Sequence, residues 1–173
     1  EDYEYYLNDS RARRVFTTAS EIERIAALDV DQDLDIVSID SDEDEKHDWR
    51  RWTADKVSSE RPSLDADDLA ALFYTSGTTG PPKGVPLSHH NVAFQIGSVM
   101  ETGVVGESDR VLLPLPPHHV YPFVIGIFSP LALGGSLVIP HSLTGPQIVR
   151  AMREGEATAV VGVPRLYGAL MTG

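Results

Sequence analysis

The 173-residue chain contains no cysteine and only three methionines. The absence of cysteine excludes a disulfide-stabilised scaffold and any zinc site built on thiolates. The chain also lacks an excess of basic residues, since 14 Lys and Arg face 26 Asp and Glu for a net charge of −12. That balance argues against nonspecific nucleic-acid binding, which needs a positive surface to neutralise phosphates. No leader opens the chain and no Met precedes Met100, so we expect a segment of a longer protein.

The negative charge is concentrated in the first part of the chain. Residues 1–68 hold 21 acids and 9 bases, whereas residues 69–173 hold 5 acids and 5 bases. Ten of the twenty residues from Asp29 to Asp48 are acidic, which is typical of a solvated loop. We therefore expect an acidic α/β segment over 1–68 with a flexible loop near 41–62, followed by a second α/β segment over 69–173.

The opposite extreme is an uncharged stretch: none of the 39 residues between Arg110 and Arg150 carries a formal charge. A membrane span in this stretch is disfavoured because Pro122, Gly126 and Pro130 interrupt it, and proline removes backbone donors that lipid cannot replace. We expect a buried helix that leads into a buried strand.

Short runs rich in Val, Ile and Leu alternate with amphipathic stretches. The runs predict strands over 14–17, 35–39, 70–75, 111–115, 136–139 and 159–163. The stretches between them predict helices over 3–8, 20–28, 88–101, 121–133, 145–154 and 165–171. Ser20 and Ser88 are expected N-caps, and Pro146 is expected in a first helical turn. The predicted fold is α/β, with a mostly parallel sheet covered by helices on both faces.

The most informative stretch is Tyr-Thr-Ser-Gly-Thr-Thr-Gly-Pro-Pro-Lys-Gly, residues 74–84. We expect a loop here, between an apolar strand and a capped helix. Its chemistry suits a polyphosphate: Gly77, Gly80 and Gly84 allow positive φ and close approach of backbone N–H groups to an anion. Hydroxyl groups and Lys83 add further donors. The spacing is not that of a Walker A motif.

This loop and the following Ser88-His89-His90-Asn91 closely resemble the phosphate-binding motif of adenylate-forming (AMP-binding) enzymes, which include acyl-CoA synthetases. The resemblance implies that the loop binds the β- and γ-phosphates of ATP, and that Lys83 has a catalytic role in holding the leaving pyrophosphate. The implied ATP-binding residues are Thr75, Ser76, Gly77, Thr78, Thr79, Gly80 and Lys83.

Residues 115–121, Leu-Pro-Pro-His-His-Val-Tyr, resemble the next motif of that family. His119 takes the position of the motif histidine, which implies a catalytic place between the acyl pocket and the α-phosphate. Residues 158–167 resemble the family's strand-then-proline segment, which makes Gly162, Val163 and Pro164 candidate substrate contacts. The apolar stretch 119–133 resembles the long-chain fatty-acid branch of the acyl-CoA synthetases.

The resemblance implies part of the large N-terminal domain of an ATP-dependent, cytoplasmic acyl-CoA synthetase. It would use ATP with Mg²⁺, a fatty or other carboxylic acid and coenzyme A, and the segment alone is expected to be inactive. No metal ligand is identified, no nucleic-acid partner is expected, and peripheral membrane contact and oligomeric state stay open. Two alternatives remain: a non-catalytic nucleotide-binding scaffold, and an amino-acid-activating domain. The absence of any acid between Asp109 and Glu154 argues for a substrate without an amine.

Overall fold

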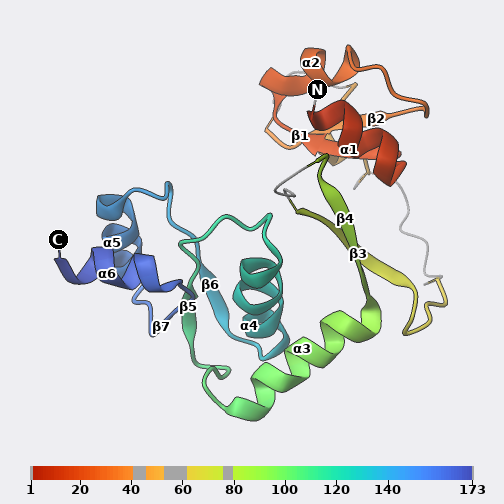
Figure 1. Ribbon diagram of the computed structural model, residues 1–173. Helices are drawn as coiled ribbons and strands as arrows, with labels where there is room; N and C mark the ends of the chain where they lie inside the picture. Colours follow the sequence, from red (N-terminus) through yellow and green to blue (C-terminus); the bar gives the residue numbers. More distant parts are fainter. Residues whose placement is uncertain (1, 41–45, 53–61, 76–79, 173) are drawn as a thin grey trace. The chain divides into compact units, whose positions relative to one another are not determined.

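The structure is a computed structural model that describes residues 2–40, 46–52, 62–75 and 80–172 (Figure 1). The chain divides into two compact units, Glu1–Leu64 and Asp65–Gly173. Each unit has its own buried apolar residues and its own β-structure, and each contains parallel strand pairs. The predicted α/β class is confirmed.

The first unit is built around a parallel pair of short strands. Its elements are α1 (Asp2–Ser10), β1 (Arg14–Thr17), η1 (Ala19–Glu21), α2 (Ile22–Ala26), β2 (Asp35–Ser38) and η2 (Trp49–Trp52). Arg14 faces Asp35 across the pair, and its Nε lies 2.8 Å from a carboxylate oxygen of Asp35. Ile25 of α2 and both Ile36 and Val37 of β2 are buried, so packing of this helix on β2 makes the small core.

The helix predicted over 20–28 begins later than expected, and Ser20 does not cap it. Ser20 lies inside the 3₁₀ turn η1, whose N-cap is Thr18, and no side chain caps α2. The backbone N–H of Ala19 instead donates to the carboxylate of Asp40 at 2.7 Å. Asp40 directly follows the paired strands, so tertiary pairing supplies the acceptor that the local sequence pattern assigned to Ser20.

The flexible loop predicted near 41–62 falls partly outside the described residues, which here are 46–52 and 62 onward. In the described part, the N–H of Ser38 donates to the carbonyl of His47 at 2.6 Å. The Nδ1 atom of His47 lies 2.7 Å from the carbonyl oxygen of Ile36. Residues 46–52 are therefore joined to β2, while the extent and flexibility of the loop stay a prediction.

The second unit contains a hairpin and a three-stranded parallel sheet. Its elements are β3 (Leu69–Thr75), β4 (Lys83–Ser88), α3 (His89–Thr102), β5 (Arg110–Leu112), η3 (Pro122–Phe128), α4 (Ser129–Ala132), β6 (Ser136–Val138), α5 (Gly145–Glu154), β7 (Ala159–Val160) and α6 (Pro164–Thr172). The sheet has the order β6-β5-β7 and is parallel throughout. Figure 1 shows α4 to one side of this sheet and α5 and α6 to the other.

The central strand β5 carries the core of the second unit. Val111 and Leu112 have no exposed surface, and Leu113, Val124 and Ile148 are also buried. These residues come from β5, the position directly after it, η3 and α5, so the uncharged stretch of the sequence supplies most of this core. Burial on both faces explains why β5 shows an uninterrupted apolar run rather than alternation.

The strand β4 was not expected. Lys83–Ser88 pairs antiparallel with β3, so a strand lies between the glycine-rich loop and α3. Pro86 obscured the pattern, because proline cannot donate to a sheet ladder and is confined to edges. Among the described residues β4 pairs with β3 alone, which makes it such an edge.

The single helix predicted over 121–133 is divided into two. Residues Pro122–Phe128 form a π-helix, and a four-residue α-helix follows from Ser129. The N–H of Ser129 donates to the carbonyl of Val124, five residues earlier, and Pro130 has no N–H to continue an α-helical ladder. The expected buried helix before β6 is therefore present with wider local winding. Within the described ranges, no helix has the length and hydrophobicity needed to cross a bilayer.

The buried centre of β5 predicts a large effect of truncation. Leu112→Ala should lower the free energy of unfolding by about 2–5 kcal/mol, because it leaves a cavity in the buried core beside β5. Denaturant unfolding of the full-length protein measures this. Leu131→Ala is the matched control, since Leu131 is 53% exposed and its truncation should cost less than about 0.5 kcal/mol. Equal effects of the two substitutions would contradict this account of the core.

Candidate functional site

The β3–β4 hairpin presents the two ends of the glycine-rich loop side by side. Thr75, the last residue of β3, faces Lys83, the first residue of β4. The backbone pairing thus brings the hydroxyl-bearing and the cationic ends of the motif to one end of the hairpin. Four of the predicted ATP-binding residues, Ser76, Gly77, Thr78 and Thr79, lie outside the described residues.

The three glycines of the motif do not share one role. Gly80 has a φ of 159°, and a Cβ placed there would meet no atom within 4 Å. Gly84 does not have the positive φ expected of it, because it lies in β4 opposite Tyr74. Its backbone takes part in strand pairing rather than in the loop. Gly77 lies outside the described residues.

The residues after the hairpin form a capped helix start. The N–H of Asn91 donates to the hydroxyl of Ser88 at 3.2 Å, and the N–H of Ser88 donates to the Asn91 side chain at 3.0 Å. This capping box confirms the predicted cap at Ser88. The N–H groups of His89 and His90 donate to the carbonyls of Asp68 and Ala66 at 3.0 and 2.8 Å. The helix start is therefore tied to the residues before β3.

The second motif forms a turn after β5. His118 and His119 are both exposed, and their ring centroids lie 4.2 Å apart. The N–H of His119 donates to the carbonyl of Pro116 at 3.4 Å, and its carbonyl accepts the N–H of Phe123 at 3.0 Å. The backbone of His119 thus leads into η3, while the residue itself is exposed.

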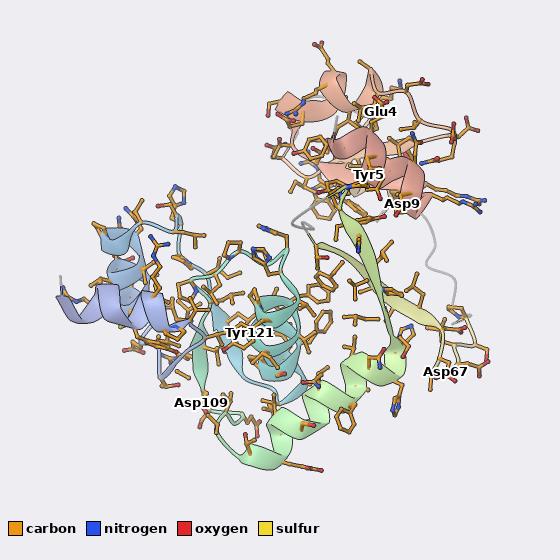
Figure 2. All side chains as sticks on the ribbon, in the orientation of Figure 1. Glu4, Tyr5, Asp9, Asp67, Asp109 and Tyr121 are labelled. Carbon is orange, nitrogen blue, oxygen red and sulfur yellow. The ribbon has the colours of Figure 1, made fainter. Side chains whose placement is uncertain are left out.

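Gly162, Val163 and Pro164 follow β7, the strand beside β5. Because β5 and β7 are parallel, their carboxyl ends meet at one edge of the sheet, where α/β proteins commonly bind ligands. The hydroxyl of Tyr121 donates to the carbonyl of Gly162 at 3.4 Å. Tyr121, labelled in Figure 2, is the residue just before η3. The structure therefore joins the second motif to the predicted substrate wall.

An apolar hollow of about 660 Å³ lies between α3 and η3. The ring of Phe73 on β3 packs edge-on against that of Phe123 on η3, with centroids 5.1 Å apart, so the hairpin contacts the same helix. None of His119, Gly162, Val163 and Pro164 lines the hollow. Its walls are Leu87, His90, Asn91, Val92, Phe94, Gln95, Val120, Tyr121, Val124 and Ile125.

The α3 wall of this hollow was not predicted from the sequence. A signal was present, since His90 and Phe94, like Asn91 and Gln95, are four residues apart and share a helix face. That face lacks a simple apolar stripe, and α3 has no buried residue, with Phe94 62% exposed. This face of α3 forms a wall of the hollow only because η3 lies across the hollow from it.

The other edge of the sheet carries a structural electrostatic network. Asp109, labelled in Figure 2 just before β5, accepts the hydroxyl of Thr158 at 2.6 Å and the N–H of Gly106 at 2.7 Å. These hydrogen bonds hold the pKa of Asp109 below its ordinary value, and the one from Thr158 has the larger effect. The ionised carboxylate of Asp109 stabilises the folded state fully above its unfolded-state pKa, and this stabilisation is lost as the pH falls through the folded-state pKa. Arg110 pairs with Glu156 beside it.

In the part of the chain that the structure describes, no group of three His, Asp or Glu side chains could hold a metal ion. The candidate site comprises the described end of the β3–β4 hairpin, two motif segments at one sheet edge and the apolar hollow between α3 and η3.

Comparison with known proteins gives the family of this arrangement. The profile of the AMP-binding enzymes matches residues 1–173. The chain belongs to the AMP-binding enzyme family. A mitochondrial malonate–CoA ligase of Mus musculus is 29% identical over an alignment of 174 residues that covers 97% of this chain and 29% of that protein. A long-chain-fatty-acid–CoA ligase of Gallus gallus is 36% identical over an alignment of 117 residues that covers 64% of this chain and 15% of that protein.

A solved family structure shares the fold closely. ATP-bound MatB from Rhodopseudomonas palustris matches with a TM-score of 0.82 and 26% identity, over 99% of this chain and 33% of that chain. The chain spans about a third or less of the length of these three proteins. The predicted resemblance to adenylate-forming enzymes is thus confirmed. The narrower long-chain assignment is not, because relatives named for different acids match comparably.

The capping box at Ser88 predicts a measurable contribution to stability. Ser88→Ala should lower the free energy of unfolding by about 1 kcal/mol, because the N–H of Asn91 loses its acceptor at the start of α3. Ser98→Ala is the control in the same helix, since the Ser98 hydroxyl donates only to the preceding turn at Phe94. Denaturant unfolding of both variants provides the comparison, and an equal loss in both would contradict the capping role.

Proposed function

We propose that the full-length protein is an ATP-dependent acyl-CoA synthetase that activates a carboxylic acid, with a long-chain fatty acid as the favoured substrate, and transfers the acyl group to coenzyme A. The observation that carries the proposal is the hairpin end, where Thr75 faces Lys83 across a loop rich in Gly, Ser and Thr. Membership of the AMP-binding family supports ATP as the nucleotide. The relatives named as CoA ligases support a thiol acceptor.

The phosphate end of the site is assigned to the glycine-rich loop. In this proposal the backbone and hydroxyl groups of 75–80 bind the β- and γ-phosphates of MgATP, and the ammonium of Lys83 neutralises the pyrophosphate as it leaves. Lys83 is exposed, so its charge is available to a ligand without loss of core packing. Donors aimed at developing charge are the main source of rate in such transfers.

The proposed reaction has two steps, formation of the acyl-adenylate and transfer of the acyl group to coenzyme A. A carboxylate oxygen of the acid attacks the α-phosphorus of ATP, and the bond from that phosphorus to the bridging oxygen breaks, giving acyl-adenylate and pyrophosphate. The sulfur of coenzyme A then attacks the acyl carbon, and the C–O bond to AMP breaks, giving the thioester. The thiol proton is lost to the surroundings. His119, at the carboxyl edge of the sheet, is assigned to the junction of acid and α-phosphate.

The acid end of the site is assigned to the hollow between α3 and η3, with Gly162, Val163 and Pro164 as a neighbouring wall. Its volume of about 660 Å³ lies within the range of small-molecule pockets. Leu87, Val92, Val124 and Ile125 give it apolar walls, which suit a hydrocarbon tail that gains about 0.8 kcal/mol per buried methylene. None of the described residues that line the hollow is an acid that could pair with the ammonium of an amino acid, which supports a fatty acid over an amino acid.

Replacement of Lys83 tests the phosphate end. Lys83→Ala in the full-length protein should reduce ATP–pyrophosphate exchange at least about tenfold, the effect expected when one charge-stabilising donor is removed. The thermal midpoint of unfolding should stay unchanged because the side chain is exposed. Arg153→Ala, which removes an exposed cation from α5, should leave exchange intact. A wild-type protein that binds MgATP without any exchange would instead support the nucleotide-binding scaffold.

Replacement of Ile125 tests the acid end. Ile125→Trp should reduce thioester formation from palmitate at least about tenfold while octanoate remains a substrate, because the indole fills part of the hollow. The comparison uses initial rates of coenzyme A consumption over saturated acids of increasing length. Val104→Trp is the control, since Val104 is 76% exposed and lies after α3. An unchanged length profile would remove the hollow from the proposal.

A further inference from the structure

The backbone leaving β7 is held by two tyrosine hydroxyls from different elements. Tyr167 of α6 donates to the carbonyl of Val160 at 2.9 Å, and Tyr121 donates to the carbonyl of Gly162 at 3.4 Å. We infer that Tyr167 is a positioning residue, which fixes the wall Gly162–Pro164 for the acid substrate. This inference rests on the proposed function, since it assigns a role within the same site.

The hydroxyl of Tyr167 closes the turn between strand and helix. Val160 is the last residue of β7, and Pro164 is the first residue of α6. The N–H groups of Leu166 and Tyr167 donate back to the carbonyl of Val163, at 2.9 and 3.4 Å. The Tyr167 side chain then reaches past this first helical turn to the end of the strand. Residues 161–163 are thereby held between two points of attachment.

Gly162 is shaped to receive the Tyr167 ring. A Cβ on Gly162 would lie 2.9 Å from Cζ of Tyr167, 3.1 Å from its hydroxyl oxygen and 3.0 Å from Cδ2 of Leu166. The backbone of Gly162 does not have a positive φ, so glycine is required here by close approach rather than by conformation. The ring lies directly on the backbone of the segment that its hydroxyl anchors.

The two tyrosines contribute little to the core. Tyr167 is 42% exposed and Tyr121 is 44% exposed, so water can replace either hydroxyl contact with small loss of stability. The contacts therefore matter chiefly for where the carbonyls and side chains of 160–164 lie. Tyr121 also lines the apolar hollow, whereas Tyr167 does not. Tyr167 acts on the substrate only through the wall it holds.

The test compares steady-state kinetics of full-length wild-type protein and Tyr167→Phe, which keeps the ring and removes the hydroxyl. The probes are MgATP, coenzyme A and the best substrate from a panel of acetate, octanoate, palmitate, ferulate and malonate. We expect KM for the acid to rise about threefold to tenfold, because the wall Gly162–Pro164 is no longer held in the position that meets the acid. KM for ATP and the thermal midpoint should be unchanged. Tyr3→Phe, at a tyrosine 46% exposed in the first unit, should alter none of these values.

A second variant approaches the same contact from the other side. Gly162→Ala should displace the Tyr167 ring and raise KM for the acid as Tyr167→Phe does, and combining the two should give no further rise. An unchanged acid KM in Tyr167→Phe would overturn the inference, as would a parallel change in both KM values together with a lowered thermal midpoint. A wild-type protein inactive on every acid of the panel would instead overturn the proposed function.

Discussion

The arrangement of the site depends on the burial of β5 at the centre of a parallel sheet. Val111 and Leu112 are wholly enclosed, with β6 on one side and β7 on the other. Parallel pairing brings the carboxyl ends of β5 and β7 to the same edge. The second motif and the segment beginning at Gly162, about forty residues apart in sequence, become neighbours for that reason alone. The network around Asp109 supports the same strand at its other end.

A second constraint joins the phosphate-binding motif to this sheet edge. The hairpin β3–β4 leads without a break into α3. The backbone N–H groups at the start of α3 donate to the Ser88 hydroxyl and to the carbonyls of residues before β3, and the Asn91 side chain completes the capping box. The contact between Phe73 and Phe123 connects the hairpin to η3. As a result the helix that follows one motif and the helix that follows the other form opposite walls of one hollow. In the proposed function, the nucleotide and acid subsites therefore share structural elements, which suits a reaction in which a carboxylate must meet a phosphate.

Gly126 within the π-helix η3 and Gly162 after β7 show how close packing shapes the proposed acid side of the site. A Cβ at Gly126 would collide with the Leu113 side chain, so η3 lies close against the end of β5. A Cβ at Gly162 would meet Tyr167 in the same manner. Both glycines allow backbone to approach side chain at the sheet edge. The wider winding of η3 continues to Ser129, whose N–H donates to the carbonyl of Val124, and Pro130 directly after it has no N–H to donate.

The sequence by itself determined the α/β class, the positions of most strands, the cap at Ser88 and the family, because apolar runs, capping residues and the glycine-rich motif are local signals. Only the tertiary structure decided that Lys83 begins an edge strand, that Asp40 rather than Ser20 serves the start of η1, and that one face of α3 lines a hollow. Each of these depends on a partner distant in the chain. Pairing with β3, the position of Asp40 after β2 and the placement of η3 are set by residues far away in the chain, so the local patterns alone did not determine them.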